Sequence, residues 1–204
     1  AFMGGVFSSI MPEMKGTLIQ AMTVMGVSMG ALIGLPPSLV ETYGSDVKKI
    51  YKANGVPLYL GLVSMFISTF VHLMIMSAII FLIAPIAFDA ALPADLPLYF
   101  ISLAVFIAVS VGVGCVLGLA MKKQSSLTMI SQIIFLPSIM LSGIMFPIDM
   151  LPTAFEAVGK IFPASWGYKL MLNDGFRLEN LWVLIVILIA CVLANVLLLK
   201  KHNQ

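Results

Sequence analysis

Charged residues are scarce in this chain. Only 10% of its 204 residues are Asp, Glu, Lys or Arg, and 61% are hydrophobic, whereas soluble domains carry about 25% charged residues. Several stretches run for about 20 residues without a charge, which is the length that crosses a hydrocarbon core roughly 30 Å thick. The sequence therefore predicts a protein that crosses a membrane several times. The net charge of +2 is too small to favour a nucleic-acid partner.

Motifs for nucleotide binding and catalysis are lacking as well. The sequence has no G-x-x-x-x-G-K-[ST] loop, no His-Glu-x-x-His and no G-x-S-x-G, so ATP binding by a P-loop is excluded. Ser142–Gly143 with His72 would be the material for an intramembrane protease, but a Ser-Gly pair beside a proline is common in packed helices. Cys115 and Cys191 lie inside apolar runs and are interpreted as small hydrophobes. We expect no enzyme activity, no cofactor and no metal site.

Long apolar runs without alternation are what the sequence has instead. Only helices and closed barrels satisfy every backbone group in lipid, so these runs predict transmembrane helices. Complete spans are expected at about 17–40, 57–84, 97–121, 125–146 and 180–199. Pro36 and Pro37 predict a kink or an early exit from the first of them. A remnant at about 1–12, in a chain that starts without Met, is expected to be the end of a truncated first span, which gives six in the parent protein.

The lysines of the short connections indicate the orientation of these spans. Residues 41–56, residues 122–124 and the C-terminal tail all carry Lys, whereas residues 85–96 carry neither Lys nor Arg. We therefore expect the first three segments in the cytoplasm, and 85–96 and 147–179 outside. The expected location is the cell membrane of a prokaryote.

The cytoplasmic connection 41–56 has a helical pattern. Val47, Ile50 and Tyr51 are spaced so that they form one apolar face of a short helix. Lysines occupy the outer face: Lys48, Lys49 and Lys52. Two interpretations stay open, namely a solvated loop that only fixes the topology and a helix that docks a cytoplasmic partner.

The stretch "SGIMFPIDMLP" breaks the chain after the span at 125–146. Ser142–Gly143 allows helices to approach closely, and Pro147 ends the regular helix. Pro152 and Pro163 then enclose a short helix that is too short to cross a membrane. This segment is either an ordinary helix at the membrane surface or a lid over an external pathway.

A few polar and small residues lie inside the apolar runs. His72 is in the middle of the span at 57–84, and we favour a hydrogen bond to a neighbouring helix over a substrate or proton site. Gln132 and Asn195 are expected to hydrogen-bond across helices, and Gly114 and Gly118 form a Gly-x-x-x-Gly packing signal.

The order of these features resembles the ABC-2 type permease family, the membrane subunits of ATP-binding-cassette exporters. The resemblance rests on "LVETYGSDVKKIYKANGVPLYL" and "LSGIMFPIDMLPTAFEAVGKIFPASWGY" and covers nearly the whole chain. It implies an all-α polytopic bundle, a single transmembrane domain over 1–204 with the type V exporter fold, six spans of which the first is truncated here. It also implies two protein partners. One is a second permease subunit in the same lipid bilayer, and the other is a separate subunit that binds the ATP.

The resemblance assigns roles to two segments. Residues 41–56 would be the coupling helix that contacts the ATPase, and 147–179 would form re-entrant helices that cap the external end. The implied coupling residues are Glu41, Gly44, Asp46, Lys48, Lys49, Ile50 and Tyr51. The implied gate residues are Ser142, Gly143, Pro147, Pro152 and Pro163. The alternative is a secondary transporter or membrane scaffold without an ATPase, which would need an intramembrane charge relay and has only His72 to offer.

Overall fold

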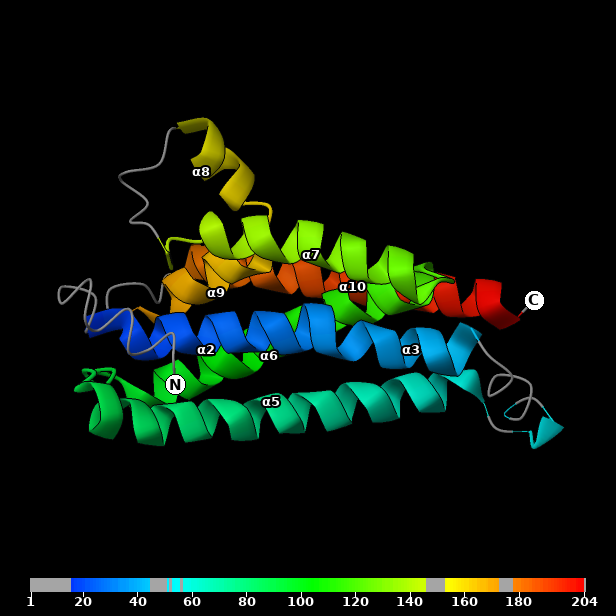
Figure 1. The fold of residues 1–204 in the computed structure, drawn as a ribbon, viewed down its shortest axis with the longest axis horizontal. Coiled ribbons are helices and arrows are strands. Elements are labelled where there is room, and N and C mark those ends of the chain that lie inside the picture. The colour runs from blue at the N-terminus through cyan, green and yellow to red at the C-terminus, as the bar shows by residue number, and fades with distance from the viewer. Residues whose placement is uncertain are drawn as a thin grey trace.

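The described part of the chain is helical. The structure, a computed structural model, describes residues 16–44, 51, 53–55, 57–145, 153–172 and 178–203, and this part contains no strand (Figure 1). The helices are α2 (Leu18–Met29), η2 (Gly30–Gly34), α3 (Leu35–Gly44), α5 (Leu58–Phe88), α6 (Leu96–Ala120), α7 (Gln124–Met140), α8 (Thr153–Gly159), α9 (Pro163–Met171) and α10 (Leu178–Asn203).

Within the described residues, four helical stretches are long and apolar enough to cross a membrane. They are Leu18–Tyr43, Leu58–Phe88, Leu96–Ala120 and Glu179–Lys201, so the prediction of an all-helical, multi-pass bundle is confirmed. The span expected at 125–146 corresponds to α7, which ends at Met140 after 17 residues, or roughly 25 Å. The remnant expected at 1–12 lies outside the described residues, and the count of six spans stays a prediction.

The helix of the Leu18–Tyr43 span does not end at its two prolines, so of the two predicted alternatives, a kink and an early exit, the early exit is wrong. Pro36 and Pro37 lie in the first turn of α3, which continues to Gly44. Proline has no N–H and its ring crowds the carbonyl four residues earlier. The π-helical turn η2 resolves this conflict, because the Leu35 N–H bonds the carbonyl of Gly30, five residues back, and the wider turn comes just before the prolines.

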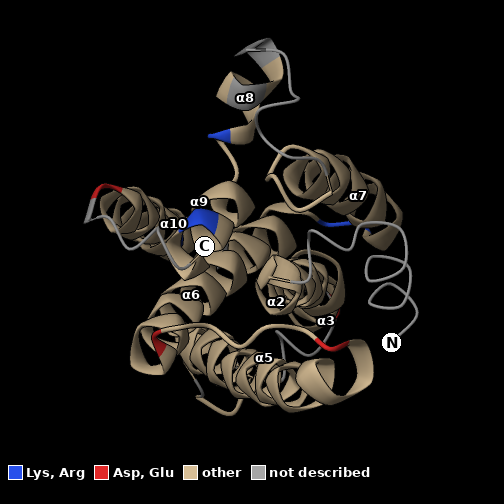
Figure 2. Cartoon of the chain, turned by 90° about the vertical axis from the view of Figure 1, so that its left-hand side faces the viewer, with Lys and Arg blue, Asp and Glu red and all other residues tan. Residues whose placement is uncertain are grey.

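The long helices run antiparallel, so their connections gather at two ends (Figure 1). One end holds the end of α3, the start of α5, the link from α6 to α7 and the end of α10. These are the places where the sequence carries its lysine-rich connections, and they lie on one side of the bundle as expected. The opposite end holds α8 and α9. Viewed from there, most of the ribbon is uncharged and only a few segments are coloured as Lys, Arg, Asp or Glu (Figure 2).

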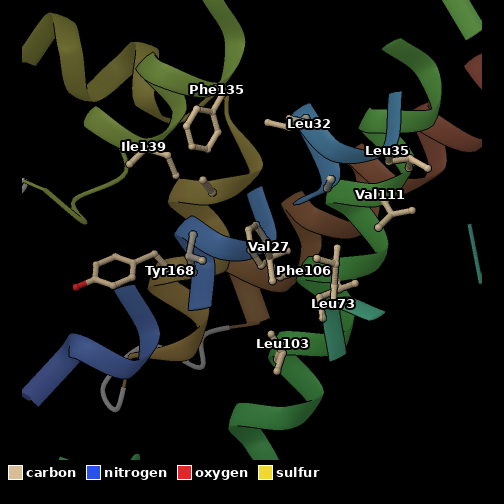
Figure 3. Close-up of a cluster of buried hydrophobic side chains, with 14 of the residues drawn as sticks. Val27, Leu32, Leu35, Leu73, Leu103, Phe106, Val111, Phe135, Ile139 and Tyr168 are labelled. Carbon is tan, nitrogen blue, oxygen red and sulfur yellow. The ribbon is translucent and has the colours of Figure 1, made fainter. Parts of the chain in front are cut away.

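Helix α6 is central to the bundle and packs against α2, α3, α5, α9 and α10. Buried apolar side chains from α2, α5, α6, α7 and α9 meet around it (Figure 3). The outward face of α5 is apolar and exposed, as expected for a surface in contact with lipid. Its residues include Val63, Ile67, Val71, Ile75 and Ile79.

Small residues on α6 allow the closest helix contacts. A Cβ at Gly114 would overlap the carbonyl oxygen of Ala31, and one at Gly118 would lie 2.6 Å from the Leu39 Cβ. The Gly-x-x-x-Gly prediction is therefore confirmed. Asn195 Nδ2 donates a hydrogen bond to the carbonyl of Gly112 at 3.2 Å and joins α10 to α6, as predicted.

Gln132 does not follow the same prediction. Its side chain is exposed on α7 and forms no hydrogen bond with another described residue. Gln132 lies on the exposed surface of α7. The sequence of an apolar run does not reveal which face of the helix is exposed.

Replacing Gly114 by Ala is expected to destabilise the bundle, because the new methyl group has no space beside Ala31. Overpacking of this kind costs about 1–3 kcal/mol, so the apparent thermal midpoint in detergent should fall by about 3–10 °C. Gly16→Ala is the matched control, since no residue that the structure describes lies within 4 Å of a Cβ there. Equal midpoints for the two variants would contradict the packing.

Candidate functional site

The expected coupling residues lie at the lysine-rich end of the bundle. Glu41 is exposed in the last turn of α3, and Gly44 ends that helix. The other expected residues before Tyr51 lie outside the described residues: Asp46, Lys48, Lys49 and Ile50. Their helical conformation and their contact with a partner therefore stay predictions.

A tyrosine that the sequence did not single out fixes the base of this connection. The Tyr43 hydroxyl donates a hydrogen bond to the carbonyl of Leu58 at 2.6 Å, which ties the end of α3 to the start of α5. Tyr51 is half-buried beside them. Its ring and hydroxyl lie close to α5, only 3.8 Å from where a Cβ at Gly61 would be. The Tyr51 ring thus packs on its own chain, although it was expected to face a partner.

Removing the Tyr43 hydroxyl should loosen this base without making a cavity. A hydrogen bond contributes about 0.5–1.5 kcal/mol, so Tyr43→Phe is expected to lower the apparent thermal midpoint by about 1–5 °C. Tyr59→Phe is the control, because Tyr59 is exposed on α5. If both variants melt like the parent, the Tyr43 bond does not hold the two helices together.

At the opposite end, the chain turns sharply after α7. Ser142 is buried and its Oγ donates a hydrogen bond to the carbonyl of Ile139 at 2.8 Å. Gly143 has a φ of +86°, a left-handed conformation that favours glycine. These two expected gate residues therefore form the turn itself. Pro147 and Pro152 lie outside the described residues.

Two short helices follow this turn, and neither is long enough to cross the membrane. Helix α8 ends at Gly159, and α9 begins with Pro163 in its first turn. Two hydrogen bonds of 2.6 Å join them, from Ser165 Oγ to the Gly159 carbonyl and from Trp166 Nε1 to the Lys160 carbonyl. No unbroken helix runs through 153–172, as predicted.

The two short helices differ in their surroundings. Helix α8 projects away from the bundle (Figures 1 and 2), and its apolar residues Phe155 and Val158 are exposed. Helix α9 instead packs among α2, α6 and α10. Gly167 lies against the Phe106 ring, and α9 carries the Tyr168 ring into the core.

A cleft of about 520 Å³ lies between the Leu18–Tyr43 span and α5, and five of its ten lining residues are polar. His72 lines it and is exposed, and it forms no hydrogen bond with another described residue. The described helices supply no such bond, so the favoured interpretation of His72, a bond to a neighbouring helix, stays a prediction. Ser64 and Ser68 also line the cleft, at four-residue spacing from His72. That spacing is visible in the sequence and was missed.

Comparison with known proteins decides between the interpretations of this bundle. The family described as "ABC-2 family transporter protein" matches residues 5–200. The chain belongs to this family. It is also 32% identical over 99 residues to "Probable multidrug ABC transporter permease YbhS" of Escherichia coli strain K12 and to the protein of the same name in E. coli O157:H7. No solved structure matches the chain.

Membership of the ABC-2 transporter family confirms the resemblance found in the sequence. It identifies the chain as part of a multi-pass membrane transporter, which fits the apolar helices and the lack of a P-loop. The segment matched in each E. coli relative covers 48% of this chain and 26% of the relative.

Proposed function

We propose that this chain is the permease subunit of an ABC-type exporter in the cell membrane of a prokaryote. It forms the translocation pathway together with a second permease subunit, and a separate ATP-binding subunit drives it. The observation that carries the proposal is the family match over residues 5–200, in a chain whose sequence lacks a P-loop. The E. coli relatives named as permeases support the same role.

The connection 41–56 is the proposed contact with the ATPase. The other link at this end, between α6 and α7, contains only Met121, Lys122 and Lys123, which is too short to dock a partner. Helix α3 continues without a break to Gly44, and Tyr43 ties it to α5. A partner that pulls on 41–56 therefore acts on two long helices at once.

The segment after α7 is the proposed external cap. Helix α9 is wedged among α2, α6 and α10, so its position depends on theirs. Helix α8 leaves the bundle with the exposed apolar residues Phe155 and Val158, where it would meet the headgroup region. Together they close the outer end of the pathway until the spans move.

The proposed orientation predicts which positions react from outside the cell. Lys49→Cys and Lys123→Cys should resist a membrane-impermeant thiol reagent in intact cells, whereas Asp95→Cys should be labelled. The native Cys115 and Cys191 are buried, so their background should be small. Labelling of the two lysine positions without labelling at 95 would invert the proposed topology.

An acidic side chain on the apolar face of 41–56 should uncouple the ATPase from transport. Burial of a large apolar side chain contributes about 1.5–3 kcal/mol, so Ile50→Asp is expected to weaken the contact about 10-fold or more. ATPase stimulation and export should both fall at a normal membrane level of the protein. Ala53→Asp, in the same connection at an exposed position, is the control for added charge. Normal export by Ile50→Asp would leave the connection as a topology anchor only.

A further inference from the structure

The Leu18–Tyr43 span and α5 touch near the middle of the bundle and again at the lysine-rich end, but they separate between these two points. Near the middle, a Cβ on Gly30 would lie 2.5 Å from Leu73 Cδ2. At the end, Tyr43 bonds the carbonyl of Leu58. The two helical units separate between these contacts, and the cleft of about 520 Å³ fills the gap.

Five of the ten residues that line this cleft are polar, at a depth where polar groups are costly. Ser64, Ser68 and His72 recur every four residues and so share one face of α5, with Ser38 and Thr69 beside them. His72 lies about 21 Å along α5 from the first residue of the helix. Once the helix is tilted, this places His72 near the middle of a hydrocarbon core roughly 30 Å thick. These five side chains form no hydrogen bond with another residue that the structure describes. Polar side chains at this depth face a partner or a water-filled cavity.

Gly34 keeps one wall of the cleft open. Nothing lies within 4 Å of the Cβ that another residue would place there, so packing inside the described chain does not require glycine. Glycine in a helix costs about 1 kcal/mol relative to Ala, which indicates that the open space itself matters. The π-helical turn η2 ends at Gly34, and such turns are frequent at functional sites.

We propose that this cleft binds an amphipathic molecule whose uncharged head carries several hydroxyl or similar hydrogen-bonding groups. The head would bond the serine, threonine and histidine side chains, and the tail would lie on Met65 and Leu73. Among the residues that the structure describes, no Lys, Arg, Asp or Glu lines the cleft, so these residues offer a charged head no counter-charge.

The size of the cleft favours a small molecule over a helix. Small-molecule pockets span about 300–1,000 Å³. The polar stretch from Ser64 to His72 is only about 12 Å long, and the Gly30–Leu73 contact closes it. A packed transmembrane helix would need a groove along the whole of α5. The proposal rests on the cleft and does not require the exporter function.

Photolabelling of the full-length protein in phosphatidylcholine nanodiscs tests the proposal directly. The probe is a monoacylglycerol with a diazirine in the acyl chain next to the head, and the control is the methyl ester of the same acyl chain, which has no hydroxyl group. The monoacylglycerol should label residues around Ser68 and Gly34 saturably. The ester should label only outward-facing residues such as Ile67 and Val71.

Two variants and one control make the result specific. Gly34→Leu fills the cleft and should raise the half-saturating probe concentration at least about tenfold. Ser68→Ala removes one hydrogen bond and should raise it about two- to tenfold, which keeps the test valid if Gly34→Leu does not fold. Gly16→Leu, at another glycine with open space around it, should have no effect.

Several results would overturn the proposal. They are equal labelling by the two probes, unchanged labelling of both cleft variants, and disulfide formation between copies carrying Ser68→Cys. The disulfide would show that the cleft is an interface between helices.

Labelling of the complex with its ATPase distinguishes two sources of the same ligand chemistry. ATP should release a transported molecule, but it should leave a resident lipid bound. Loss of coupling with intact labelling would refute the exporter function alone.

Discussion

Polar groups that this chain carries into the membrane need partners, because lipid supplies none. This constraint explains the helices and also their irregularities. The turn η2 lets the backbone pass Pro36 and Pro37 without leaving the helix. Asn195 bonds the Gly112 carbonyl, and the hydroxyls of Thr23 and Tyr99 bond one another at 3.0 Å. Other buried polar atoms, such as those of the Gln20 side chain and the Ser77 hydroxyl, have no partner among the described residues. The cleft beside His72 differs from them because it leaves several polar side chains exposed, where something else can bind them.

Helix α6 connects the two proposed working parts of the permease. Its first half carries α9 through the contact between Phe106 and Gly167, and its second half carries α3 through Gly118 and Leu39. A shift of α3 that the ATPase imposes from the lysine-rich end would therefore reach the external wedge through one helix. Glycines at the α3 contact make this fit close, so that displacement of one helix displaces the other.

The sequence was sufficient for four of the five complete spans, for their order and for the gathering of lysine-rich connections at one end, because these follow from the placement of charge alone. It also predicted the Asn195 bond and the Gly114 packing. The early exit that it offered at Pro36 as an alternative to a kink was wrong, because a wider turn before a proline is a backbone adjustment that composition does not encode. The roles of Tyr43 and Tyr168 and the exposure of His72 were missed, since each depends on which helices become neighbours.

The central claim is that α5 turns a polar face toward an open cleft and an apolar face toward lipid. Single cysteines from position 63 to 72, tested one at a time with a small water-soluble thiol reagent in membranes, examine it most directly. The account predicts rapid reaction at Ser64, Ser68 and His72 and slow reaction at Val63, Ile67 and Val71. Uniform reaction along the helix, or none at the three polar positions, would contradict it.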